Sequence, residues 1–173
     1  MKIVITGKSG SGKNYLLTML MKKYKYLPKF TTRPKRTGEK DGYDYDFITR
    51  DKMKRMDIKY VQSFKIKPTG WKRFFTFDTV WYYGMSVYNY ENTDILIMTP
   101  YELSLVDTSN FFIIYLDIDR ETRKNRIAAR NDSSDSIERR LSSDDKDFEN
   151  FDNYDVVITN SNYSIEDIEN IMP

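Results

Sequence analysis

The chain of 173 residues contains no cysteine and no histidine. The first absence excludes disulfide bonds and thiol nucleophiles, and the second removes the most common general base and metal ligand. Any chemistry must therefore rest on Lys, Arg, carboxylates, backbone amides and metal ions. Such groups suit phosphoryl transfer, in which positioning and charge neutralisation supply most of the catalysis.

Long apolar runs and a large excess of one charge are also lacking. No apolar segment approaches the roughly 20 residues that span a bilayer, and the N-terminus has no apolar stretch of the signal-peptide kind. The 28 basic and 26 acidic residues give a formal net charge of +2, too small to indicate nucleic acid or a membrane as the main partner. We expect a soluble, cytoplasmic protein whose residues 1–173 form one domain with a substantial core.

A glycine-rich loop follows the apolar residues 3–5. It reads G-K-S-G-S-G-K-N and fits the phosphate-loop pattern G-x-x-x-x-G-K-[ST], except that Asn replaces Ser or Thr. The glycines let backbone N–H groups point at phosphate oxygens, and the next helix adds its positive N-terminal end. The candidate ATP-binding residues of this loop are Gly7, Lys8, Ser9, Gly10, Ser11, Gly12, Lys13 and Asn14. A flexible loop that binds nothing is the alternative, but it leaves the lysine and the flanking strand and helix unexplained.

Apolar segments alternate with helical ones along most of the chain. The expected strands are residues 2–6, 94–98, 111–116 and 154–159; the expected helices are 13–24, 50–56, 101–106, 120–129, 136–148 and 165–171; residues 28–47 read as loop and 131–135 as a polar break. Residues 60–66 and 73–81 read as an inserted hairpin with its turn at 68–70. The pattern predicts an α/β fold, a parallel sheet of the P-loop NTPase type with helices on both faces.

Residues 31–47 read T-T-R-P-K-R-T-G-E-K-D-G-Y-D-Y-D-F. They resemble the guanylate kinase family, whose members carry T-T-R-x-x-R-x-G-E-x-x-G-x-D-Y-x-F at this distance after the loop. Weaker likenesses at residues 81–84, 126–141 and 159–160 extend the resemblance over nearly the whole chain. It implies a β-rich subdomain at about 30–90 that binds a nucleoside monophosphate (NMP), a helical lid at about 126–145, and ATP with Mg²⁺ as the phosphoryl donor.

The resemblance also implies roles for single residues. The acceptor phosphate would be held by Arg33, Arg36, Tyr45 and Tyr83, which suits the ability of paired guanidinium groups to grip phosphate. Arg130 and Arg140 would neutralise charge on the transferring phosphoryl group, and with Lys13, which would hold the donor, and Arg33 they make up the candidate catalytic residues. Asn160 would line the adenine site. For Arg126 and Arg139 a lid role and an ordinary helix-surface role stay open. The alternative for the whole set is a solvated charged loop and surface arginines.

The positions that read guanine in the family are altered. Gln62 stands where the family has glutamate, Met85 where it has Ser or Thr, and residues 96–101 (L-I-M-T-P-Y) lack the aspartate of the family's D-x-D-x-Q-G. A carboxylate accepts hydrogen bonds from two donors, whereas an amide offers one acceptor and one donor group. We therefore hypothesise that the preferred base is not guanine, and a clear preference for GMP or dGMP would contradict this.

Asn14 bears on the metal, because the hydroxyl usual at this position ligates Mg²⁺. The Asn14 amide oxygen is a candidate ligand, directly or through water. Asp94, Asp117 and Asp119 are possible outer-sphere carboxylates for this metal. Asp117 and Asp119 fit better as caps of the helix that starts near residue 120.

The function predicted is an ATP- and Mg²⁺-dependent kinase acting on GMP, dGMP or another (deoxy)nucleoside monophosphate. Two alternatives stay open: an inactive guanylate-kinase-like binding module, and a kinase for a phosphorylated sugar without a base. The intact loop glycines and Lys13 favour catalysis over the first. The tyrosine-containing segments favour a nucleotide over the second.

Overall fold

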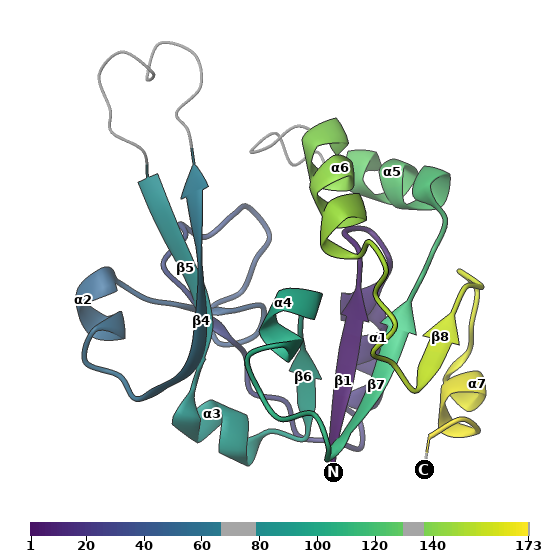
Figure 1. Cartoon of the computed structure of the whole chain (residues 1–173), viewed down its shortest axis with the longest axis horizontal. Coiled ribbons are helices and arrows are strands. Elements are labelled where there is room, and N and C mark those ends of the chain that lie inside the picture. Colours follow the sequence, from purple (N-terminus) through teal and green to yellow (C-terminus); the bar gives the residue numbers. More distant parts are fainter. Residues whose placement is uncertain (67–78, 130–136, 173) are drawn as a thin grey trace. The chain divides into compact units, whose positions relative to one another are not determined.

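The computed structural model describes residues 1–66, 79–129 and 137–172, which divide into two compact units. The first unit joins Met1–Tyr26 to Asp94–Pro173, and the second is Leu27–Thr93. Each unit contains one four-stranded sheet. Figure 1 labels the longer strands of both sheets. The expected turn at 68–70, most of the expected strand at 73–81 and the polar break at 131–135 lie outside the described residues. Within the described part of the chain, no helix has the length and apolar character needed to cross a membrane.

The sheet of the first unit is fully parallel, as predicted. Its order is β6-β1-β7-β8, with β6 at Ile95–Ile97, β1 at Lys2–Gly7, β7 at Phe111–Leu116 and β8 at Val156–Ile158. The strands read as continuous apolar runs because both faces of a parallel sheet are covered. Ile5 and Ile114, at the centre of the sheet, are fully buried.

Helices α1 (Lys13–Leu20), α4 (Pro100–Leu103), α5 (Arg120–Ala129), α6 (Ile137–Asp147) and α7 (Ile165–Glu169) belong to the same unit. Helix α1 buries Leu16, Leu17 and Leu20 in the core. It ends four residues before its predicted end, because the chain turns so that Tyr26 can pair with Ile95 beside β6. Strand β7 and helix α5 have the predicted bounds.

The second unit is built on an antiparallel pair, β4 (Ile58–Ile66) and β5 (Thr79–Ser86), in a sheet of order β3-β2-β5-β4. Its other elements are β2 (Phe30–Thr31), β3 (Asp46–Phe47), α2 (Arg50–Met53) and α3 (Val87–Asn92). The prediction of loop throughout 28–47 was wrong at β2 and β3. Two-residue strands are too short to show a period, and they form here because β2 pairs with β5.

The predicted end of the second hairpin strand at residue 81 was also wrong, because β5 continues to Ser86. Gly84 lies inside it, and a Cβ there would come within 2.5 Å of the Tyr60 carbonyl oxygen and 2.7 Å of the Phe30 ring. The glycine therefore serves the close approach of neighbouring chains, not a turn. Ser86 then caps α3, which the sequence analysis missed.

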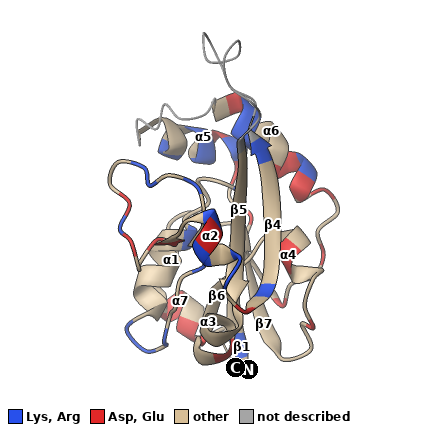
Figure 2. Ribbon diagram, turned by 90° about the vertical axis from the view of Figure 1, so that its left-hand side faces the viewer, with Lys and Arg blue, Asp and Glu red and all other residues tan. Residues whose placement is uncertain are grey.

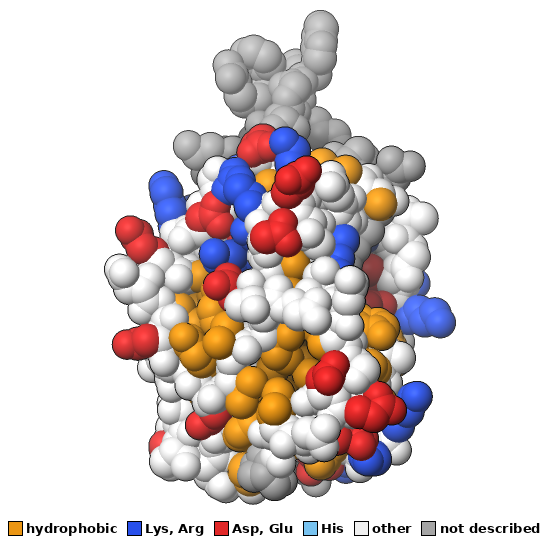
Figure 3. Space-filling model, turned by 90° about the vertical axis from the view of Figure 1, so that its right-hand side faces the viewer, with side chains coloured by type: hydrophobic (Ala, Val, Ile, Leu, Met, Phe, Trp, Pro, Cys, Tyr) orange, Lys and Arg blue, Asp and Glu red, His pale blue; other side chains and the backbone are white. Residues whose placement is uncertain are grey.

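Strand β8 is an edge of its sheet, and apolar side chains gather on the face of the unit that Figure 3 views. Tyr154, just before β8, and Val157, within it, are exposed. Nearby, the Tyr115 ring of β7 stacks on Phe148, just after α6, with 5.4 Å between centroids. This aromatic contact fixes the end of α6 to the sheet.

Candidate phosphate-binding sites in the two units

The loop between β1 and α1 has the conformation that its glycines predict. Gly7, Gly10 and Gly12 have φ of 148°, 79° and 102°. At Gly10 a Cβ would also lie 2.6 Å from the Arg123 carbonyl oxygen of α5, so a side chain is excluded by space as well as by backbone conformation. The loop is a turn of backbone N–H groups in front of a helix, which is the arrangement that binds phosphate.

Lys13 is folded back onto this loop. Its Nζ donates to the carbonyl oxygens of Gly7 at 2.6 Å and Lys8 at 3.0 Å. The next residue, Asn14, is exposed. The Ser11 hydroxyl is buried and makes no hydrogen bond in the described structure. The loop thus holds a cation, an exposed amide and one unused hydroxyl within a few residues.

Two acidic residues of α6 also reach the loop. The Ser9 N–H donates to Asp144 Oδ2 at 2.7 Å, and Lys8 Nζ lies 3.6 Å from Asp145 Oδ1. Lys8 is also 3.9 Å from Asp117. Figure 2 shows how both kinds of charge gather on α5 and α6. No signal along the chain points to these contacts, since Ser9 and Asp144 are 135 positions apart.

Arg126 of α5 supports the loop from another side. Its Nη1 lies 3.4 Å from the carbonyl oxygens of Gly10 and Ser11, and its Nη2 donates to the Ser161 carbonyl oxygen at 3.2 Å. The sequence leaves two roles open for Arg126, a lid role and an ordinary helix-surface role. These contacts do not fit the helix-surface role. In the structure Arg126 joins the phosphate loop to the segment after β8.

The remaining predicted residues of the first unit are less connected to the loop. Arg130 lies outside the described residues, and Arg140 is half-buried on α6. Asn160 is exposed, and its side-chain oxygen accepts the Asn162 N–H at 2.9 Å. Asp119 caps α5 through the Thr122 N–H at 2.8 Å, as predicted. The same prediction for Asp117 was wrong, because its carboxylate accepts the Tyr115 hydroxyl and faces Lys8.

The second unit holds a cluster around Arg33, whose side chain is only 3% exposed. Its Nη1 and Nη2 donate to the two Glu39 oxygens at 3.0 and 2.7 Å, a bidentate pair. Its Nη1 also donates to the Pro34 carbonyl oxygen, and its Nε donates to the Tyr83 hydroxyl at 3.1 Å. Within the described residues, these bonds use four of the five N–H groups of the guanidinium and leave one, on Nη2.

Aromatic rings enclose this guanidinium. It lies 5.7 Å from the centre of Tyr45 and 5.6 Å from that of Phe47. Tyr83 packs edge-on against Tyr45 at 5.8 Å and Phe64 at 5.3 Å. Three of the four residues predicted to hold the acceptor phosphate, Arg33, Tyr45 and Tyr83, are therefore brought together.

Glu39 was not among the predicted site residues, although it belongs to the motif that carries the resemblance. Besides Arg33, it accepts the backbone N–H of Arg36 at 2.7 Å. Burial opposes its ionisation, but the hydrogen bonds from Arg33 and Arg36 outweigh burial and lower the pKa of Glu39. Burial likewise opposes the charge of Arg33, and the bonds to Glu39 more than offset it and raise the pKa of Arg33. Burial raises the pKa of the Tyr83 hydroxyl, so it stays a neutral donor at physiological pH.

The two altered base-reading positions differ in surroundings. Gln62 lies directly opposite Tyr83 in the β4–β5 pairing and is half-buried. Met85 lies opposite Tyr60 and is 1% exposed, so it is packed in the core of its unit. Gln62 thus presents polar atoms beside the Arg33 cluster, and Met85 presents no open surface.

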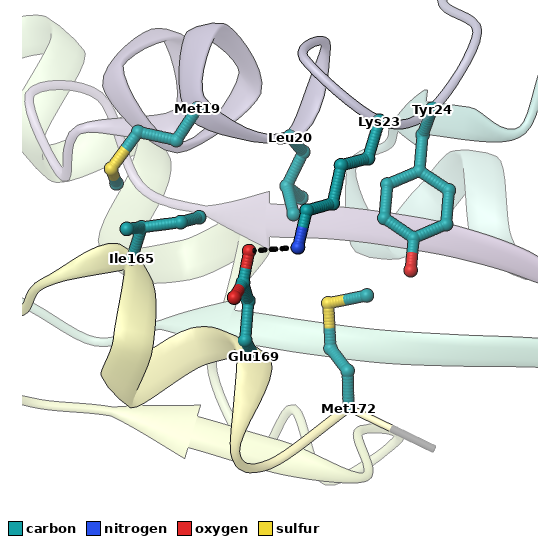
Figure 4. Close-up of a pocket in the computed structure, with 7 residues that line it drawn as sticks. All are labelled: Met19, Leu20, Lys23, Tyr24, Ile165, Glu169 and Met172. Carbon is teal, nitrogen blue, oxygen red and sulfur yellow. Dashed lines mark hydrogen bonds and ion pairs between the residues drawn. The ribbon is translucent and has the colours of Figure 1, made fainter.

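A pocket in the first unit lies at the other end of α1 from the phosphate loop (Figure 4). It is lined by Met19, Leu20, Lys23, Tyr24, Ile165, Glu169 and Met172. The Lys23–Glu169 ion pair, at 2.6 Å, crosses it. No predicted site residue lines this pocket.

A parallel sheet whose first strand runs through a glycine-rich loop into a helix defines the class of phosphate-loop α/β proteins. Comparison with known proteins narrows the class. The guanylate kinase family model matches residues 1–61. The guanylate kinase of Bacillus subtilis is 30% identical over 176 residues, which are 92% of this chain and 80% of that protein. The guanylate kinase of Nostoc sp. is 28% identical over 178 residues, 93% of this chain and 82% of that protein.

A solved structure agrees on the fold. The guanylate kinase of Anaplasma phagocytophilum superposes with a TM-score of 0.59 and 21% identity, covering 98% of this chain and 80% of that one. The chain belongs to the guanylate kinase family and is a nucleoside monophosphate kinase, a phosphotransferase.

Proposed function

We propose that the protein transfers the γ-phosphoryl group of ATP to a (deoxy)nucleoside monophosphate. The observation that carries the proposal is that two arrangements suited to a phosphate group are found, the loop with Lys13 in one unit and the Arg33–Tyr83 cluster in the other. The loop N–H groups and Lys13 would hold the donor, and Arg33, Arg36, Tyr45 and Tyr83 the acceptor. An acceptor phosphate oxygen would attack the γ-phosphorus in line, with no covalent enzyme intermediate.

Mg²⁺ with ATP fits the residues of the loop. Among the described residues no three acidic side chains are grouped as cation ligands. Mg²⁺ is commonly held by one or two protein oxygens together with substrate phosphates and water, so a loop that offers the exposed Asn14 amide and the unused Ser11 hydroxyl is compatible with it. When bound, the ion would neutralise charge on the donor phosphates. Arg140 and Arg130 remain the proposed arginines for the transferring group, and Asn160 the proposed adenine contact.

The base selected is proposed to depend on Gln62. Its amide can accept one hydrogen bond and donate another, so it matches a base edge that carries one carbonyl and one N–H. Guanine, hypoxanthine, uracil and thymine all have such an edge. A carboxylate would instead reward the additional 2-amino group of guanine. We therefore propose that guanine is not the preferred base, and that GMP and IMP, which differ only in this amino group, react with similar kcat/KM.

The test is an ADP-release assay with ATP, Mg²⁺ and each of GMP, dGMP, IMP, dTMP, dUMP, dCMP and dAMP. The Gln62→Glu variant should raise the GMP-to-IMP ratio by roughly tenfold or more, since one hydrogen bond to a charged group is restored. A wild-type enzyme that clearly prefers GMP or dGMP contradicts the base proposal and leaves the kinase proposal standing. Absence of turnover with every acceptor contradicts both.

A further inference from the structure

Helix α6 carries acidic residues at its C-terminal end, where they do not stabilise the helix. Asp144, Asp145 and Asp147 all lie in the last turn of the helix, which ends at Asp147. Negative side chains at a helix C-terminus face the negative end of its dipole, which is unfavourable. Helix stability therefore does not account for Asp144 and Asp145, which both make contacts outside the helix.

The contacts lead to the phosphate loop. Asp144 Oδ2 accepts the Ser9 N–H at 2.7 Å, and Asp145 Oδ1 lies 3.6 Å from Lys8 Nζ. A backbone N–H of such a loop normally serves a phosphate oxygen, and a carboxylate oxygen has the same charge sign and the same accepting geometry. Asp144 therefore satisfies the loop in the way that a phosphate oxygen would.

The position of Asp144 is held from two directions. Asp145, its neighbour, lies 3.3 Å from Arg123 Nη2 and also pairs with Arg120, both on α5. After the helix, Phe148 is stacked on Tyr115 of the sheet. The carboxylate is thus presented to Ser9 by a braced helix end and not by a free side chain.

We infer that Asp144 is an internal competitor for the donor phosphate, which a nucleotide must displace from the Ser9 N–H before the loop can close around it. This inference rests on the proposed use of ATP. Because the binding-competent loop is then only a fraction of the nucleotide-free protein, the apparent affinity for ATP is reduced by that fraction. Removing the Asp144 charge should therefore tighten ATP binding.

The first measurement is calorimetric titration of ATP with Mg²⁺, and with no acceptor present, into wild type, Asp144→Asn and Asp144→Ala. We expect both variants to bind ATP roughly ten- to hundredfold more tightly, the scale of one hydrogen bond to a charged group. Glu149→Gln is the matched control, since it removes one negative charge from an exposed residue just after the same helix. It should bind as the wild type does.

The second measurement needs no nucleotide. In wild type the Ser9 amide should exchange its hydrogen slowly, and in Asp144→Ala the exchange should be faster while amides in β7 are unchanged. Unchanged far-ultraviolet circular dichroism shows that the variants are folded, and the nearly isosteric Asp144→Asn guards against a packing effect of alanine.

Several results would overturn the inference. Equal ATP affinity in wild type and both Asp144 variants would show that Asp144 does not compete with the nucleotide. Weaker binding in the variants would show that Asp144 helps to hold the nucleotide. An equal gain in ATP affinity in Glu149→Gln would show that the effect comes from the net charge of the protein and not from the Ser9 contact. If wild type and variants all fail to bind ATP, the proposed donor is wrong as well, an outcome distinct from equal binding.

Discussion

The two units are each proposed to hold a phosphate group, and they would do so with different parts of the chain. The first unit offers backbone N–H groups of a loop shaped by glycines with positive φ, and the charged side chains of Lys8 and Asp145 beside this loop are 19% and 37% exposed. The second unit uses side chains, with a guanidinium that is 3% exposed and enclosed by rings. A backbone site is visible in sequence as glycine spacing, whereas a side-chain site depends on which partners the fold brings together.

Both sites already contain a carboxylate, and the two carboxylates have different consequences. Glu39 is bound bidentately to Arg33 and also to the Arg36 N–H, so it builds the site. Asp144 takes one N–H of the loop, so it occupies the site. The first carboxylate should be needed for stability and the second should be dispensable for it.

Loss of the loop cation should have the largest effect. Lys13 is the only side chain of the described loop that binds two of its carbonyl oxygens, at Gly7 and Lys8, and it is the proposed ligand of the donor phosphates. Lys13→Ala should lower kcat/KM for ATP by roughly a hundred- to thousandfold, because charge stabilisation in the transition state is lost. Steady-state kinetics measure this, with the exposed Lys22→Ala as control. A loss below tenfold would mean that Lys13 is not the loop's catalytic cation.

Two glycines allow the steric cost of a side chain to be measured separately from the cost of a left-handed backbone. Gly10 and Gly38 have similar φ, 79° and 85°, but a Cβ at Gly10 would lie 2.6 Å from the Arg123 carbonyl oxygen and a Cβ at Gly38 would meet nothing within 4 Å. Gly38→Ala should cost about 1 kcal/mol, the strain of a left-handed residue, and Gly10→Ala about 3 kcal/mol. Urea denaturation gives both values. Equal costs would show that the loop adjusts to relieve the contact with α5.

Breaking the buried ion pair tests whether the second site is built on it. Glu39→Gln leaves the Arg33 charge without its carboxylate, and we expect the free energy of unfolding to fall by about 2 to 3 kcal/mol. The KM for the acceptor should rise as well, since Arg33 also orients Tyr83. Asp51→Asn, in the exposed helix α2, is the control. If stability is unchanged while KM rises, Glu39 acts on the acceptor and not on the fold.

The sequence predicted the features that depend on local signals, and it did not predict those that depend on contacts between distant segments. The apolar run of β7 and the cap at Asp119 fixed Phe111–Leu116 and Arg120–Ala129 at their observed bounds, since each signal is local. Strands β2 and β3 could not be found, because their only cause is pairing with distant segments.

The candidate site divides in the same way. The loop conformation followed from its glycines, and the grouping of Arg33, Tyr45 and Tyr83 followed from the resemblance. The Arg33–Glu39 pair and the Ser9–Asp144 bond required knowledge of which charges become neighbours. No pattern of residues along this chain indicates the contact between Ser9 and Asp144, which are 135 positions apart.

The smallest expected effect is the pH dependence of the buried pair. The pKa of Glu39 is lowered from its ordinary 4.5, so its stabilising contribution is present above the unfolded-state pKa and is lost as pH falls through the folded-state pKa. The difference in unfolding free energy between wild type and Glu39→Gln should therefore be constant from pH 7 to about pH 5 and shrink below about pH 4.5. Taking this difference cancels other acids such as Asp46, whose burial raises its pKa and gives the opposite slope. Urea denaturation at intervals down to pH 3 measures it, and a difference that stays constant to pH 3 would show that Glu39 contributes through packing and not through its charge.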